Sequence, residues 1–134
     1  MRIDPLHPDG WAPARGYSNG ILVRGSSALL FVAGQIAWDA EQRLVGRDDF
    51  VLQFRTALEN VRAVVEAGGG ETGHIARLTI YVTDKQQYLA DLKGVGAAYR
   101  DVLGKHYPAM ALVQVADLLE EGALVEIEAT AVLP

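Results

Sequence analysis

The sequence predicts an α+β fold in which a single mixed β-sheet carries two helices on one of its faces. Two stretches of the chain repeat apolar residues at helical spacing, which indicates two amphipathic helices. The remaining apolar stretches have strand length, and several alternate apolar with polar residues. Helices on both faces would require strands that are apolar throughout, so both helices are expected on the same face. The expected order of elements is β-β-α-β-α-β-β.

Composition limits the classes of protein to which the chain can belong. Its 134 residues, half of them hydrophobic, suit one core, and we expect residues 1–134 to form a single domain. No apolar run is long enough to span a membrane, and no secretory signal is visible, so a cytoplasmic location is expected. The absence of cysteine excludes a disulfide scaffold and a Cys nucleophile. A net charge of −5 argues against nucleic acid as the main partner.

The first half of the chain predicts two strands and one helix. Residues 1–16 are expected to be an irregular lead-in, because prolines and glycines interrupt any period. Ile21–Arg24 and Ala28–Gln35 are strand-like runs, and the Gly25–Ser27 segment between them indicates a hairpin. A helix is expected from Asp49 to Ala67, with Asp48 as its N-cap and three glycines at its end.

The second half predicts one more helix and three more strands. In Ile75–Val82, apolar residues alternate with Arg77, Thr79 and Tyr81, the pattern of a strand packed on one face. Thr83 and Gln86 resemble a capping box that opens a second helix, which ends at Gly104. The last two expected strands are Ala109–Ala116 and Leu124–Val132.

The last two strands predict a sheet face that the helices leave uncovered. One face of the final strand is small and apolar, whereas the other carries Leu124, Glu126, Glu128, Thr130 and Val132. On Ala109–Ala116, we assign Met110, Leu112 and Gln114 to this second face. Such a mixture favours a subunit interface that also walls a polar cavity, so we expect an oligomer with clefts between its chains.

Glu126 and Glu128 are candidates for acid–base chemistry. Two carboxylates two residues apart on a strand point the same way, and their repulsion in a partly buried cleft would raise the pKa of at least one. The alternative is that both are solvated or are paired with a lysine or arginine of a neighbour. Spacing alone favours this alternative.

Five segments, taken in order, resemble the RidA/YjgF family. Each is weak by itself, but together they follow the family's order and spacing over nearly the whole chain. They are Gly16-Tyr17-Ser18-Asn19-Gly20, Phe31-Val32-Ala33-Gly34-Gln35-Ile36, Ala57-Leu58-Glu59-Asn60-Val61, Ile80-Tyr81-Val82-Thr83-Asp84 and Val125-Glu126-Ile127-Glu128-Ala129.

The resemblance implies a chorismate-mutase-like fold assembled as a homotrimer, with clefts between subunits. It also implies hydrolysis of reactive enamines and imines to 2-oxo acids and ammonia, without a cofactor or metal. Residue by residue, Glu126 matches the carboxylate that handles water, Gly34 the glycine beside the ligand, and Tyr17 the tyrosine of the cleft.

The family's arginine, which holds the substrate carboxylate, does not carry over. The residue after Pro108-Ala109 is Met110, which cannot donate the two charge-assisted hydrogen bonds of a guanidinium. Arg15, Arg24 and His106 are alternative sources of a cation, although a structural role for His106 is favoured. Tyr107 is a candidate wall of the pocket. The histidines show no metal-ligand spacing, so we assign no metal.

Three functions are compatible with these residues. We favour a RidA-like hydrolase that takes a larger or less anionic imine or enamine. The alternative is a non-catalytic small-molecule-binding or regulatory trimer, with an imine, enamine or carboxylate as its ligand, because a fold does not fix a function. Ribonuclease or translation-inhibitor activity, labels that the family has also carried, is disfavoured. The chain is acidic, and it lacks both a basic stripe and an evident His–His or His–Lys pair.

Overall fold

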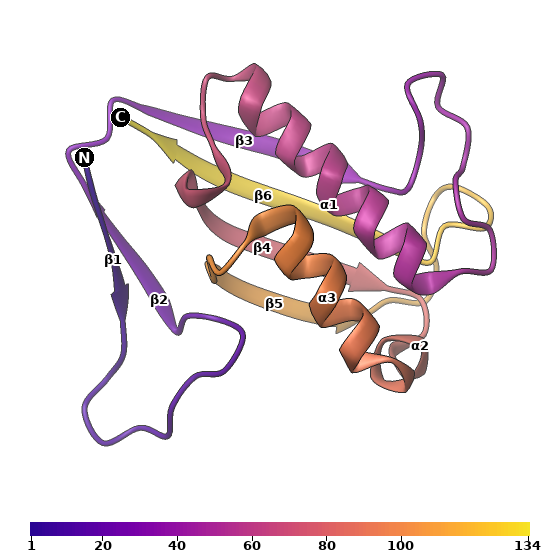
Figure 1. Ribbon diagram of the computed structural model, residues 1–134, viewed down its shortest axis with the longest axis horizontal. Helices are drawn as coiled ribbons and strands as arrows, with labels where there is room; N and C mark the ends of the chain where they lie inside the picture. The colour runs from indigo at the N-terminus through magenta and orange to yellow at the C-terminus, as the bar shows by residue number, and fades with distance from the viewer.

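The computed structural model describes residues 1–134 and is built around a four-stranded mixed sheet (Figure 1). The strand order is β3-β6-β4-β5; β6 is antiparallel to both of its neighbours, and β4 is parallel to β5. The strands are β3 (Ala28–Gln35), β4 (Ile75–Val82), β5 (Ala109–Gln114) and β6 (Val125–Leu133).

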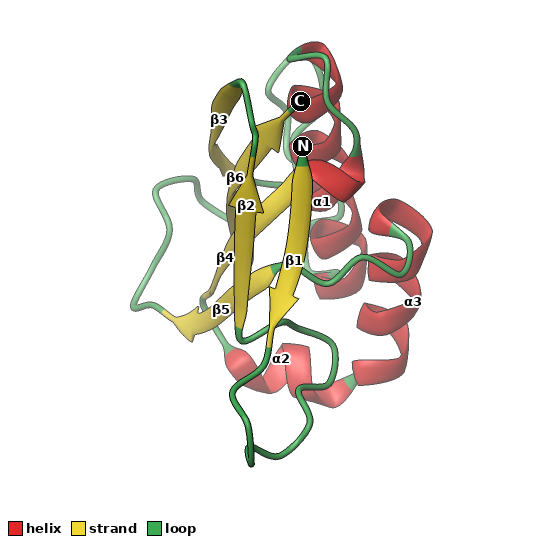
Figure 2. Cartoon of the chain, turned by 90° about the vertical axis from the view of Figure 1, so that its left-hand side faces the viewer, coloured by secondary structure: helices red, strands yellow, loops and turns green.

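The helices cover one face of this sheet, as Figure 2 shows from the side. They are α1 (Phe50–Ala67), α2 (Lys85–Ala90) and α3 (Leu92–Leu103), and a 3-10 turn, η1 (Thr72–His74), precedes β4. Alternate residues of β6 are buried beneath them: Val125, Ile127, Ala129 and Ala131. The predicted α+β fold, with one main mixed sheet and its helices on one face, is therefore confirmed. No helix is both long enough and apolar enough to cross a membrane.

The helix α1 begins one residue later than expected. Asp49 is its N-cap, and the carboxylate accepts a hydrogen bond from the Leu52 N–H at 3.1 Å. Asp48 instead lies in the left-handed region, with φ of 63°. The glycines end the helix as predicted, and the left-handed conformation falls at Gly69, with φ of 85°.

The predicted second helix is divided into α2 and α3 at Asp91. The backbone of Asp91 leaves the helical region, with φ of −142° and ψ of 62°, and its side chain accepts a hydrogen bond from the Gly94 N–H at 2.8 Å. Aspartate favours such caps because its carboxylate competes for backbone donors. Likewise, Asp84 rather than Thr83 caps α2. The continuous apolar spacing of the sequence concealed this break.

The N-terminal segment differs from the prediction in two ways. The expected irregular lead-in, residues 1–16, contains a strand, β1 (Arg2–Leu6), which tolerates Pro5 because it has an open edge. This strand pairs antiparallel with β2 (Gly20–Arg24) in a separate two-stranded sheet. The expected hairpin between β2 and β3 is therefore wrong: β3 pairs only with β6, and Gly25, with φ of 71°, turns the chain between the two sheets.

The face assigned to β5 is also wrong. The parallel register places Met110 beside Leu78 and Leu112 beside Ile80, and both partners are buried under the helices. Met110 and Leu112 therefore pack against the core, and it is Val113 that faces away from the helices. This strand is apolar on both of its faces, so alternation in the sequence could not distinguish them.

One buried polar side chain connects α1 to two loops. Gln53 is fully buried, and its amide nitrogen donates to the carbonyls of Gly46 at 3.1 Å and Gly122 at 3.0 Å. Its amide oxygen accepts a hydrogen bond from the Leu124 N–H at 2.8 Å. These bonds hold the entry to β6 against the loop that precedes α1.

We expect Gln53→Leu to lower the free energy of unfolding by about 2–5 kcal/mol, because it leaves buried backbone groups without partners. Urea unfolding monitored by circular dichroism measures the change. Gln86→Leu is the control: Gln86 is exposed, and the expected change is within about 0.5 kcal/mol. Equal stability of the two variants would contradict a clamping role for Gln53.

Candidate active site

The side of the main sheet opposite the helices is here called the uncovered face. It combines exposed apolar side chains of β3 with charged ones of β4 and β6. The sequence predicts this mixture within the final strand itself, but Leu124 packs against the core. Leu29 is 59% exposed and Phe31 is 74% exposed, although Val132 is buried. The polar residues come from the two central strands: Arg77, Thr79 and Tyr81 of β4, and Glu126, Glu128 and Thr130 of β6.

Two of the predicted site residues, Gly34 and Glu126, lie in contact on this face. The pairing of β3 with β6 is irregular between Val32 and Gln35, and Gly34 falls within that irregularity. A Cβ on Gly34 would lie 2.8 Å from Cδ and 2.9 Å from Oε2 of Glu126. Only glycine therefore allows the Glu126 carboxylate to lie this close to the β3 backbone.

The segment that follows Gly34 is held by α1. The Asn60 side-chain amide donates hydrogen bonds to the carbonyls of Ile36 and Trp38, each at 3.0 Å. Gln53, two turns earlier on the same helix, fixes the start of β6. Both strands that form the Gly34–Glu126 contact are thus positioned by polar side chains of α1.

The two carboxylates of β6 differ in their partners. Glu128 accepts a hydrogen bond from the Tyr81 hydroxyl at 2.8 Å. Glu126 forms no ion pair or hydrogen bond within the chain. The pKa of Tyr81 is raised, chiefly by its hydrogen bond to Glu128, then by desolvation and by the negative charges of Glu128 and Glu126, while Arg77 opposes the shift.

Sequence reasoning did not select Tyr81 or Arg77 as site residues. The signal was present, because both alternate with the buried residues of the Ile75–Val82 strand. Antiparallel pairing then places Tyr81 opposite Glu126 and Arg77 opposite Thr130. Only knowledge that β4 and β6 are neighbours identifies these pairs.

The remaining predicted residues lie away from Glu126 within one chain. Tyr17 precedes β2 and is 42% exposed. The neighbouring Ser18 donates its backbone N–H to the Pro108 carbonyl at 3.1 Å, at the β5 edge of the main sheet. Because β4 separates β5 from β6, Tyr17 and Glu126 are not brought together.

The alternative cations are placed as follows. His106 Nε2 donates to the Ile75 carbonyl at 2.6 Å, which ties the loop before β5 to the start of β4 and gives the ring a structural role. Arg24 pairs with Asp4 at 3.1 Å. Arg15 is exposed and forms no ion pair.

Met110 and Tyr107 line a different cavity, of about 180 Å³, on the helix side of the sheet. The Tyr107 ring stacks on Tyr99, with centroids 5.6 Å apart and planes 3° from parallel. Burial raises the pKa of Tyr99, whose hydroxyl donates to the His106 carbonyl at 2.6 Å. The lining is largely apolar and aromatic, with Arg100 among its residues. No three His, Asp or Glu side chains gather closely enough to hold a metal ion.

Comparison with known proteins identifies the family. The family model described as Endoribonuclease L-PSP matches residues 9–133. A member of the conserved Rid protein family from Yersinia pestis, YyfB, superposes with a TM-score of 0.87 at 29% identity, over 99% of this chain and 100% of that one. The chain belongs to the RidA/YjgF family.

Two curated relatives are similar to this chain over most of its length. Protein DfrA of Myxococcus xanthus is 35% identical over 133 residues, which covers 98% of this chain and 97% of that protein. The 2-iminobutanoate/2-iminopropanoate deaminase of Salmonella typhimurium is 37% identical over 108 residues, covering 78% and 80% respectively. The RidA/YjgF family therefore includes imine deaminases.

The Tyr81–Glu128 bond predicts a pH dependence. Because the folded-state pKa of Tyr81 is raised above an unfolded value of about 10, its stabilising contribution is complete below about pH 10. That contribution is lost as the pH rises through the folded-state pKa. Glu128→Gln removes the adjacent charge, so the pKa of Tyr81 should fall toward its ordinary value.

Titration of the Tyr81 ring carbon by NMR measures this pKa directly. Glu121→Gln is the matched control, because Glu121 is an exposed carboxylate that does not contact Tyr81, and it should leave the titration unchanged. If Glu128→Gln titrates like the wild type, Glu128 is not the cause of the shift.

Proposed function

We propose that the chain is a deaminase-type hydrolase of small enamine or imine intermediates, with Glu126 as the catalytic base. The observation that supports it best is the contact between Gly34 and Glu126, the two residues that the family resemblance selects from strands distant in sequence. The activity named for the Salmonella relative is consistent with this proposal. Glu126 forms no bond within the chain, so its carboxylate is available to a water molecule.

The reaction needs a base and then a proton donor. Glu126 accepts a proton from water while the oxygen bonds to the imine carbon and the C=N π pair moves to nitrogen. The nitrogen takes up one proton from solvent to give the neutral carbinolamine, and then the proton that Glu126 removed from water, which makes it an ammonium leaving group. The C–N bond then breaks, ammonia leaves, and the hydroxyl loses a proton as the carbonyl forms. An enamine first tautomerises to the imine and then follows the same steps.

The substrate is proposed to be larger or less anionic than a simple 2-imino acid. Met110 stands at the position of the family's arginine and offers no donor to a carboxylate, so the carboxylate clamp that the resemblance implies is absent. The lack of a donor at Met110 also favours the second candidate, a non-catalytic trimer that binds a small molecule. Endoribonuclease activity is not proposed, because the two carboxylates on the uncovered face would repel phosphate.

We also propose that the chain assembles as a homotrimer through the uncovered face. Leu29, Phe31 and Val113 are exposed there, an apolar surface that favours contact between protein chains. The distance of Tyr17 from Glu126 within one chain is consistent with clefts whose walls come from two copies.

The central test compares ammonia release from an enzyme-generated 2-imino acid, and from a panel of bulkier enamines, in wild type and Glu126→Gln. We expect a decrease of about 10²–10⁴-fold in the rate, the usual contribution of a general base. Glu121→Gln is the matched control and should retain the wild-type rate. If the wild-type protein hydrolyses no substrate faster than buffer alone does, the binding function is favoured.

Gly34→Ala tests the contact itself. The new methyl group would collide with the Glu126 carboxylate, which is the flexible end of a side chain, so the rate should fall while the free energy of unfolding changes by less than about 1 kcal/mol. In Gly20→Ala the methyl would meet its nearest atom at an ordinary 3.6 Å, and the rate should be unaffected. Full activity of Gly34→Ala would disconnect this contact from catalysis.

Assembly is tested by light scattering after size-exclusion chromatography. We expect wild type to elute with the mass of three 14.5-kDa chains. Phe31→Asp, which introduces a charge into the proposed interface, should shift the population toward monomer. Leu119→Asp, at a fully exposed apolar residue in the loop before β6, is the control. A monomeric wild type would refute the trimer.

A further inference from the structure

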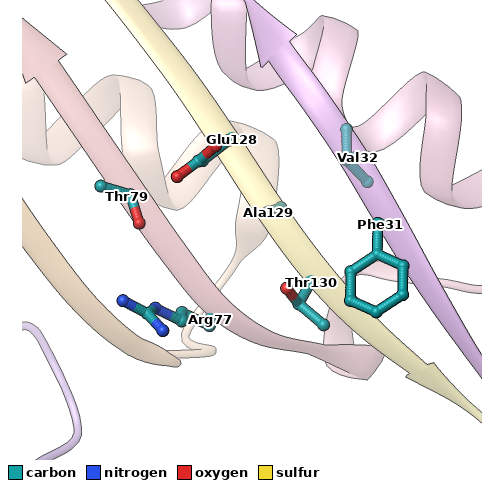
Figure 3. Close-up of a pocket in the computed structure, with 7 residues that line it drawn as sticks. All are labelled: Phe31, Val32, Arg77, Thr79, Glu128, Ala129 and Thr130. Carbon is teal, nitrogen blue, oxygen red and sulfur yellow. The ribbon is translucent and has the colours of Figure 1, made fainter.

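The uncovered face contains a second feature, a cavity lined by Glu128 that the proposed reaction does not use. Its volume is about 230 Å³. Figure 3 shows Arg77 and Glu128 at opposite ends of this cavity, with Thr79 and Thr130 on its other sides. The Phe31 side chain lies beyond Thr130 and supplies an apolar wall.

The two charges of this cavity are not neutralised by each other. Arg77 forms no ion pair within 4.0 Å and no hydrogen bond. Glu128 uses one carboxylate oxygen, Oε1, to accept from Tyr81, which leaves Oε2 free. The hydroxyls of Thr79 and Thr130 also form no hydrogen bond within the chain. The cavity therefore presents a cationic fork, an anion and two hydroxyls, all with unused hydrogen-bonding capacity.

We propose that this cavity binds a small zwitterion of the α-amino acid class. The ligand carboxylate bonds to the Arg77 guanidinium, whose planar fork matches two carboxylate oxygens. The ligand ammonium group donates to Glu128 Oε2. The threonine hydroxyls bond to either group, and a short side chain contacts Phe31. A ligand with only a negative charge would be repelled by Glu128, and a ligand with only a positive charge would be repelled by Arg77. A ligand with both charges is therefore preferred over either.

The site is distinct from the proposed catalytic centre. Arg77 pairs with Thr130, four residues along β6 from Glu126, and Glu128 lies between them on the same face. The inference therefore does not require that the chain be a hydrolase. If copies of the chain meet over the uncovered face, they would enclose the cavity and strengthen its charge contacts by excluding water.

The test uses glycine, which has no C=N bond and is not a substrate for the proposed hydrolysis. Isothermal titration calorimetry measures its affinity for wild type, alongside acetate and methylammonium as the two halves of the ligand. Backbone NMR shifts at Thr79 and Thr130 report whether binding occurs at this cavity. We expect glycine to bind more tightly than either half, with shifts at both threonines.

Arg77→Met and Glu128→Gln should each weaken glycine binding by about 10- to 100-fold, the effect of losing a hydrogen bond to a charged group. Arg77→Lys keeps the charge but loses the fork and should give an intermediate affinity. Arg55→Met and Glu121→Gln are the controls, since Arg55 pairs with Asp101 on the helices and Glu121 is exposed in a loop. Thermal unfolding verifies that each variant is folded.

Three results would overturn the proposal: no glycine binding to wild type, binding that Arg77→Met and Glu128→Gln leave unchanged, or acetate as tight as glycine. The last would indicate a plain anion site. Because glycine binding and ammonia release are measured separately, loss of hydrolysis in Glu126→Gln does not affect this outcome. Conversely, a cavity that fails to bind glycine leaves the hydrolase proposal intact.

Discussion

The amide of Gln53 makes all of its hydrogen bonds inside the protein, at a point that solvent does not reach. A buried amide without partners would be costly, so its three bonds fix the relative position of the segments that supply them. Those segments are the loop before α1 and the turn that leads into β6. This clamp fixes the chain as far as Leu124, two residues before Glu126.

The helix α1 has two roles in consequence. Its apolar stripe packs on the sheet and supplies six of the 20 residues of the buried core. Its polar side chains Gln53 and Asn60 position the chain at either end of the Gly34–Glu126 contact. The site is therefore built on the most regular part of the fold. A site supported in this way keeps its geometry without a bound ligand.

Sequence patterns predicted the strands in which one face is buried and the other is exposed to solvent. The final strand and Ile75–Val82 alternate clearly, so their faces, and the position of Glu126 on the uncovered one, could be predicted. The face of β5 could not, because its residues are apolar on both sides. The separation of β2 from β3 could not be predicted either, since pairing depends on backbone hydrogen bonds that side chains do not encode.

The same limit applies to the site. Gly34 and Glu126 were selected by resemblance, and their contact depends on a bulge that no periodicity shows. Once the strands are in place, two carboxylates of identical chemistry acquire different surroundings. Glu128 is engaged by Tyr81 and faces Arg77 across a cavity, whereas Glu126 lies free over a glycine. The neighbours, and not the spacing along the strand, therefore leave the Glu126 carboxylate without a partner and engage Glu128 with Tyr81.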